Sequence, residues 1–148
     1  MVCLICSILG GRPKKELPEL EYSGSLTYAD LFHILSEKFP DVPLYLPDLV
    51  YATCKKEDIE RFLAWDSTND QKYIAEKFDC DDYSYRFKGN ITVPPWAWLP
   101  VGIVWTDKHA LNCFVDSDNN FWFIEPQSDR IQEKLEPWQG DKLSFIAL

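Results

Sequence analysis

The segment VGIVWTDKHALNCFVDSDNNFWFIE (residues 101–125) is the strongest indication of fold class in the sequence. Here the residue pattern changes to the period of two that is typical of β-strands. We expect strands at 101–106, 109–116 and 121–125, with the polar SDNN segment as the hairpin turn between the last two. Weaker strands are expected at 130–136 and 143–148. The C-terminal part of the chain therefore predicts an antiparallel sheet.

Helices are predicted before this sheet. Thr27, with Asp30 three residues later, forms an Asp variant of the capping box, and apolar residues follow at helical spacing. Further helices are expected at 55–64, at 71–77 and from residue 80 onward. Helices first and an antiparallel sheet afterwards is the α+β pattern, with N-terminal helices packed on a small antiparallel β-sheet.

Length and charge limit the possible classes of protein. The 148 residues predict a single domain, 1–148, in which residues 1–24 form a strand and a polar arm that precede the core. The net charge of −9 argues against binding to nucleic acid or to anionic membranes, because phosphates are bound by clustered Lys and Arg. No stretch has the length of a membrane span, and no signal peptide is evident, so we expect a cytoplasmic protein.

Three residues have the types and the order of a nucleophile, a base and an orienting acid. Cys80 lies at the predicted start of a helix, where the helix dipole and a neighbouring imidazolium would lower the pKa of a thiol. His109 opens one strand and Glu125 ends the next. A strand-borne histidine with a carboxylate beside it completes the arrangement. The two side chains share a face only if the hairpin loop has an odd number of residues, for example 117–119.

Each of these residues also has a structural interpretation. Cys80 could be a buried helix cysteine, and His109 could be an exposed histidine at a strand end. Glu125 could be a solvated glutamate at the end of its strand. Asp81 and Asp82 could be acids that stabilise the first turn of a helix. The sequence has five cysteines, an odd number, so they cannot all pair within the chain. The other four lie in apolar surroundings and are interpreted as structural.

The amino-acid sequences of several motifs resemble those of a known family. Tyr73, EKFDCDDY (residues 76–83), HALN (109–112) and IEPQ (124–127) together resemble the C-terminal domain of the fungal mushroom agglutinins. That domain is a calcium-dependent, papain-like cysteine protease with a Cys-His-Glu triad, and it has small stand-alone relatives in bacteria and phages. The resemblance implies a papain-like architecture. The sugar-binding β-trefoil of those agglutinins has no counterpart in the sequence, so the resemblance carries no carbohydrate specificity.

The resemblance also implies roles for individual residues. Cys80 would be the nucleophile, His109 the general base and Glu125 the orienting acid, acting on a peptide or protein substrate. A calcium site would use Asp81, Asp82 and Gln127. Independently of the resemblance, unneutralised aspartates beside Cys80 would raise its pKa, and a bound Ca²⁺ would reverse that effect. Chelation is then expected to slow the alkylation of Cys80.

The sequence therefore predicts a calcium-dependent, papain-like cysteine hydrolase that cleaves peptide bonds. Two alternatives remain open. The first is a non-peptidase acyl enzyme, such as an amidase or a transglutaminase-type catalyst, that uses the same triad. The second is a non-catalytic binding or inhibitor module of phage or bacterial origin on the same fold, for which Cys80→Ala would leave function intact.

Overall fold

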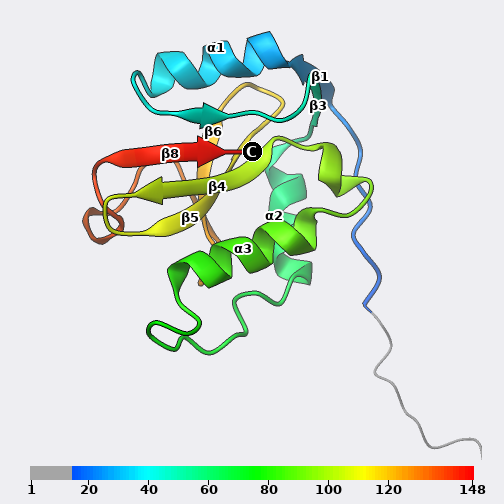
Figure 1. The fold of residues 1–148 in the computed structure, drawn as a ribbon. Coiled ribbons are helices and arrows are strands. Elements are labelled where there is room, and N and C mark those ends of the chain that lie inside the picture. Colours follow the sequence, from blue (N-terminus) through cyan, green and yellow to red (C-terminus); the bar gives the residue numbers. More distant parts are fainter. Residues whose placement is uncertain (1–14) are drawn as a thin grey trace, which may run out of the picture.

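The computed structural model describes residues 15–148 (Figure 1). The strand predicted at the start of the 1–24 segment lies outside the described residues, as do Cys3 and Cys6. None of the helices within 15–148 combines the length and apolarity needed to cross a bilayer.

A six-stranded sheet forms the centre of the fold, with the strand order β2-β8-β4-β5-β6-β7. All neighbouring strands are antiparallel except β2 and β8, which run parallel. The strands are β2 (Leu44–Tyr45), β4 (Val101–Thr106), β5 (Ala110–Val115), β6 (Phe121–Glu125), β7 (Arg130–Gln132) and β8 (Leu143–Ala147). A separate two-stranded sheet pairs β1 (Gly24–Thr27) with β3 (Val50–Thr53).

Three α-helices cover the six-stranded sheet: α1 (Tyr28–Lys38), α2 (Lys56–Trp65) and α3 (Cys80–Ile91). Figure 1 shows α1 on one side of β8, β4 and β5 and α3 on the other. The helix α1 begins at the predicted capping box, because Asp30 N donates to Thr27 Oγ1 at 3.2 Å while Thr27 N donates to Asp30 Oδ2 at 3.0 Å. Two short 3₁₀ helices complete the set, η1 (Trp96–Trp98) and η2 (Pro137–Gln139).

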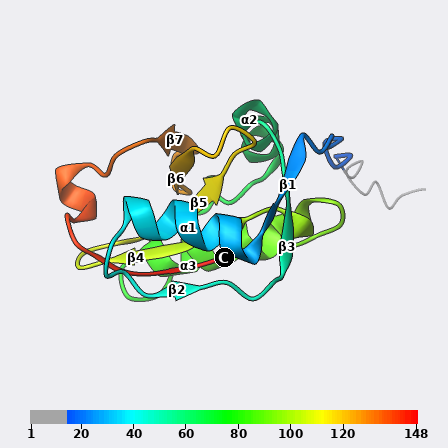
Figure 2. The same cartoon turned by 90° about the horizontal axis from the view of Figure 1, so that it is seen from above.

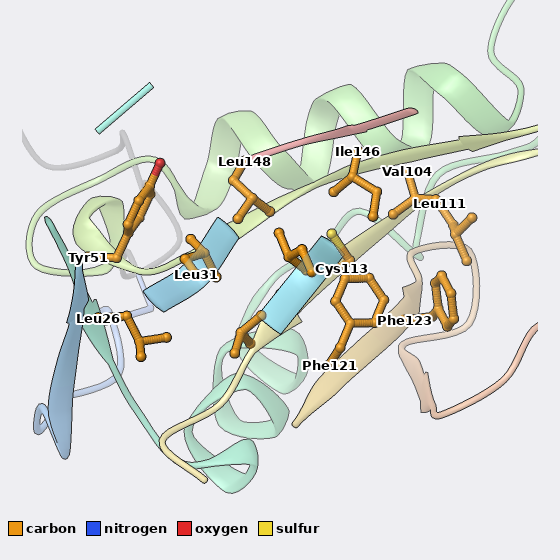
Figure 3. Packing of buried hydrophobic residues seen from close by; sticks show 12 residues of the cluster. Leu26, Leu31, Tyr51, Val104, Leu111, Cys113, Phe121, Phe123, Ile146 and Leu148 are labelled. Carbon is orange, nitrogen blue, oxygen red and sulfur yellow. The ribbon is translucent and has the colours of Figure 1, made fainter. Parts of the chain in front are cut away.

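The alternation of side chains along the central strands divides the interior into two cores. On the α1 side, Leu111, Cys113 and Val115 of β5 pack with apolar residues of α1, β4, β6 and β8 (Figure 3). On the other side, Phe114 of β5 packs with the buried faces of α2 and α3. Both cores are formed by one sheet, so strand register decides which residues reach each face.

The polar arm before the core contacts α2 and η1. Lys15 Nζ donates to the carbonyl of Ala64, and the indole N–H of Trp65 donates to the carbonyl of Lys15 at 3.0 Å. The indole N–H of Trp96 donates to the carbonyl of Pro18 at 3.2 Å. These contacts fix the arm from residue 15 onward. Figure 2 shows the arm beside β1 at one end of the molecule.

The predicted α+β class is confirmed, whereas the papain-like architecture is not. The helix predicted at 71–77 is wrong. The chain there forms turns with a bridge between Ile74 and Phe78, and Glu76 has a positive φ of 58°. This reversal brings Phe78 against Tyr83, with ring centroids 4.8 Å apart. The assignment of 1–148 to a single domain stays a prediction.

Candidate functional site

The hairpin of β5 and β6 brings His109 and Glu125 together. Asn112 lies opposite Ile124, and this register leaves a three-residue loop, 117–119, because Asp116 N donates to the carbonyl of Asn120 at 3.0 Å. The odd loop length is the one that the sequence required for a shared face. Nε2 of His109 lies 2.8 Å from Oε2 of Glu125, and both side chains are buried.

This pair belongs to a larger buried network that the sequence did not reveal. Gln139, in η2, donates from Nε2 to Oε2 of Glu125 at 2.8 Å. Its Oε1 accepts from Nε2 of Gln132 at 2.6 Å, and the ring of Trp138 meets the His109 ring edge-on with centroids 4.9 Å apart. Gln139 is fully buried although it lies in a polar segment. No local pattern marks it, because its burial depends on how residues 133–142 fold back onto the sheet.

Cys80 begins α3 as predicted, but its surroundings oppose thiolate formation. Burial raises the pKa of the Cys80 thiol, a hydrogen bond with the backbone of Ala110 lowers it, and the charges of Asp79 and Asp81 raise it further. The net direction is upward, against the expected effect of a helix N-terminus. No hydrogen bond joins Cys80 to His109 among the residues that the structure describes. His109 and Glu125 thus form a hydrogen-bonded pair, and the thiol of Cys80 is not hydrogen-bonded to either residue among those that the structure describes.

Of the predicted calcium ligands Asp81, Asp82 and Gln127, Asp81 belongs to a cluster of potential ligand atoms whose other members are Asp79 and Cys80. The carboxylates of Asp79 and Asp81 and the sulfur of Cys80 lie within 4.8 Å of one another. A hydrogen bond between the two carboxyl groups raises the pKa of Asp81 and lowers that of Asp79. Oδ2 of Asp82 instead accepts from the backbone of Asp79 at 3.2 Å. The backbone N–H of Gln127 lies 3.4 Å from Oε1 of Glu125. Asp79 and Asp81 thus form a pair of neighbouring carboxyl groups beside Cys80, and calcium binding stays a prediction.

A second group of acids lies between the α2–α3 connection and the β6–β7 turn. Asp129 has a φ of 58° and accepts from Nδ2 of Asn69 at 2.7 Å. Burial, followed by the charges of Asp66 and Asp70, raises the pKa of Asp129 to about 6. Since an unfolded chain has the ordinary Asp pKa of about 4, the folded state binds this proton more tightly, and ionisation of Asp129 costs stability as the pH rises through 6.

We expect Asp129→Asn to stabilise the fold at pH 7.5 by about 1 kcal/mol. This is less than the full pKa shift would give, because the site is partly open to solvent, which screens the charges. The gain should shrink as the pH falls from 6 and vanish below about 4, where Asp129 is protonated in both states. Asparagine tolerates the positive φ and can still accept from Asn69. Urea unfolding at pH 7.5 and pH 3.5 measures the effect. Asp41→Asn, at another exposed turn with a φ of 67°, is the control, and an equal gain from both substitutions would contradict the assignment.

Two hollows in the described surface lie between the C-terminal half of α1 and the β6–β7 side of the sheet. They share Lys38 and Glu133 and therefore adjoin. The first, which we call the polar hollow, has a volume of about 730 Å³ and is lined by Ile34, Glu37, Lys38, Asn119, Asn120, Phe121, Trp122 and Glu133. The second, which we call the basic hollow, has a volume of about 690 Å³ and is lined by Lys38, Phe39, Lys108, Phe123, Glu133, Lys134, Leu135, Glu136, Pro137, Gly140, Asp141 and Leu143.

Aromatic side chains form a second exposed feature, which we call the aromatic row. The rings of Tyr85, Trp105, Phe145 and Tyr45 follow one another from α3 across β4 and β8 to β2, with successive centroids 6.4, 5.9 and 5.9 Å apart. Tyr85 and Tyr45 are exposed at its two ends, and the two inner rings are half-buried. A contiguous exposed apolar surface of this kind is typical of a contact surface.

Comparison with solved structures identifies similar folds. No family model and no curated protein match the sequence. A structure described as a PSL1a–E64 complex has a TM-score of 0.71 and 25% identity to this chain, covering 84% of this chain and 50% of that one. The lectin of Polyporus squamosus, bound to the human-type influenza-binding epitope Neu5Acα2-6Galβ1-4GlcNAc, has a TM-score of 0.67 and 24% identity, covering 84% and 49%. The chain thus spans about half the length of these proteins.

These similarities contradict the prediction of a calcium-dependent cysteine hydrolase, and with it the expected peptidase activity and peptide substrate. One of the two similar structures is described as a lectin, a class of binding protein, and no family model matches the sequence. The pKa of Cys80 is raised, which agrees with this correction. Among the described residues, no hydrogen bond joins Cys80 to His109, and this agrees with it as well. The comparisons establish the fold: over 84% of its length, the chain folds like about half of a mushroom lectin.

Proposed function

We propose that the chain is a non-catalytic carbohydrate-binding module and that the sugar occupies the polar hollow. The observation that carries the proposal is the chemistry of this hollow, which places carboxylates, amides and an indole around one space of about 730 Å³. Binding sites for small molecules commonly have volumes of about 300 to 1,000 Å³ and a few convergent polar groups. The glycan bound by the similar Polyporus squamosus lectin supports the choice of ligand.

The sugar site has to be sought on the α+β fold itself, because residues 15–148 contain no β-trefoil. In the polar hollow, Glu37 and Glu133 supply carboxylate oxygens that accept hydrogen bonds from hydroxyl groups. The side-chain amides of Asn119 and Asn120 both donate and accept. Trp122 adds an apolar ring against which the C–H face of a sugar can pack. The hollow therefore satisfies both the polar and the apolar faces of a pyranose.

The hairpin loop that lines the hollow is held in place before any ligand binds. Oδ1 of Asp116 accepts from the backbone of Asp118 and of Asn120, each at 2.9 Å. Oδ2 of the same residue accepts from the indole N–H of Trp122 at 2.7 Å. One buried carboxylate thus orders both the loop and the ring, which reduces the entropy lost on binding.

The aromatic row is the competing location for a sugar. Its rings can stack on a ligand, but the only polar groups that they carry are the two tyrosine hydroxyls and the indole N–H. Carboxylates and amides form directional hydrogen bonds with the hydroxyl groups of a sugar. A row of aromatic rings does not provide such hydrogen bonds. We therefore assign the sugar to the polar hollow, and the experiment below separates the two surfaces.

A glycan array followed by calorimetry with the strongest ligand tests the proposal. Glu37→Ala and Glu133→Ala each remove an exposed acceptor from the hollow, and we expect each to weaken binding about tenfold, since a hydrogen bond to a charged group contributes roughly 1.5 to 3 kcal/mol. Tyr45→Ala on the aromatic row and Cys80→Ala are the controls, and both should bind like the unaltered protein. Titrations with CaCl₂ and with EDTA show whether calcium contributes.

Two results would reject parts of this proposal. If no glycan on the array binds, the chain is not a carbohydrate-binding module. If Tyr45→Ala abolishes binding while Glu37→Ala and Glu133→Ala retain it, the sugar lies on the aromatic row and the assignment of the site is wrong.

A further inference from the structure

We propose that the basic hollow is a separate binding site for a small anion that carries an apolar body, such as a hydrocarbon carboxylate or phosphate. This site is distinct from the polar hollow in chemistry, and the proposal does not depend on carbohydrate binding. It rests on three observations: a concentration of lysines in an acidic protein, an apolar floor beneath them, and a wall that is fixed by buried hydrogen bonds.

The charge around the hollow differs from that of the chain as a whole. The protein has a net charge of −9, yet Lys38, Lys108 and Lys134 all line this one space. The hollow also contains acids, but Oε1 of Glu136 already accepts from Arg130 at 2.6 Å. Only the other two lining acids, Glu133 and Asp141, then oppose the three lysines. All three lysines are exposed, so their ammonium groups are free to orient toward a bound anion.

The floor of the hollow is apolar. Phe39, which follows α1, and Phe123 of β6 contribute rings whose centroids lie 6.2 Å apart, and Leu135 and Leu143 add aliphatic side chains. These residues belong to the core on the α1 side or pack against it. A volume of about 690 Å³ above such a floor accommodates a drug-sized molecule. A purely hydrophilic anion would leave this apolar surface uncovered, so we infer an amphiphilic ligand.

The wall formed by residues 133–142 is held by hydrogen bonds on its inner side. The carbonyl of Gln139 accepts from Oγ1 of Thr106 at 2.6 Å, and its side chain joins the buried network of Glu125 and Gln132. The carbonyl of Lys142 accepts from the backbone of Asp107 at 2.9 Å. The network thus fixes this wall of the hollow, which reduces the entropy lost on binding.

Fluorescence of 1-anilinonaphthalene-8-sulfonate tests the proposal, because this probe combines a sulfonate with an apolar body. We expect it to bind the folded protein and to raise its melting temperature, which distinguishes binding to the native state from binding to unfolded chains. The triple variant Lys38→Gln, Lys108→Gln, Lys134→Gln should bind the probe at least tenfold more weakly. The matched control, Lys56→Gln, Lys72→Gln, Lys77→Gln, removes the same charge elsewhere and should bind like the unaltered protein.

Competition identifies the head group. Octanoate and octyl phosphate are expected to displace the probe, whereas octanol, which has the same apolar body and no charge, should not. The better of the two anions as a competitor identifies the preferred head group. The proposal is overturned if the probe lowers or leaves unchanged the melting temperature, if both triple variants bind equally, or if octanol competes as well as the anions.

Discussion

Glu125→Ala is expected to lower the free energy of unfolding by about 3 kcal/mol or more. The substitution removes the acceptor of two buried donors, Nε2 of His109 and Nε2 of Gln139, each 2.8 Å from the same carboxylate oxygen. A buried donor that loses its partner costs roughly 1 to 3 kcal/mol, and the alanine also leaves a cavity where the glutamate side chain packed. Urea unfolding followed by tryptophan fluorescence measures the loss.

The controls for this prediction use the same kind of side chain. Glu125→Gln retains one acceptor oxygen and should cost clearly less than alanine. Glu133→Ala removes an exposed carboxylate from the neighbouring segment and should change stability by less than about 0.5 kcal/mol. If Glu125→Ala lowers the free energy of unfolding as little as Glu133→Ala does, the buried network does not hold residues 133–142 on the sheet.

Gly102→Ala should also lower the free energy of unfolding by about 3 kcal/mol, because a methyl group at this position would clash with the backbone. A Cβ atom at this position would lie 2.1 Å from the carbonyl oxygen of Ala147 and 2.7 Å from Cα of Leu148. Both are backbone atoms, so no rotamer change relieves the contact, and β8 has to move away from β4. Because β8 also pairs with β2, the displacement would disturb two strand pairs at once.

Gly89→Ala is the matched control. It lies within α3, and a Cβ atom there meets nothing within 4 Å. Alanine favours a helix over glycine, so this change should stabilise the protein by about 0.5 to 1 kcal/mol. Thermal unfolding of the two variants should therefore move in opposite directions. A neutral effect of Gly102→Ala would mean that β4 and β8 separate without cost.

The parts of the fold that the sequence could predict are those with local signals. The capping box of Thr27 and Asp30 defines the start of α1, and the polar segment after Val115 defines the hairpin. The odd loop length, which was the condition for a shared face, is present in the structure and explains why His109 meets Glu125. Each of these features depends on residues that are close in sequence, where turn and capping chemistry act directly.

The parts that could not be predicted depend on contacts between distant segments. The parallel pairing of β2 with β8 joins residues that lie far apart along the chain, and β2 has only two residues. The burial of Gln139 and the convergence of three lysines likewise follow from the path of residues 133–142. The prediction for Cys80 placed the residue correctly at the start of α3 and anticipated that the neighbouring aspartates raise its pKa, whereas the contribution of burial depends on the folded chain. Local burial and the two neighbouring aspartates outweigh the helix dipole there.

The position of β8 between β2 and β4 has a consequence for synthesis on the ribosome. The N-terminal helix α1 and the strand β2 leave the ribosome early, yet β2 has no partner in the sheet until β8 emerges. At about 5 to 20 residues per second, the intervening stretch of roughly 100 residues delays that pairing by roughly 5 to 20 seconds. During this interval, the apolar surface that β8 later covers is open to chaperones and to other nascent chains.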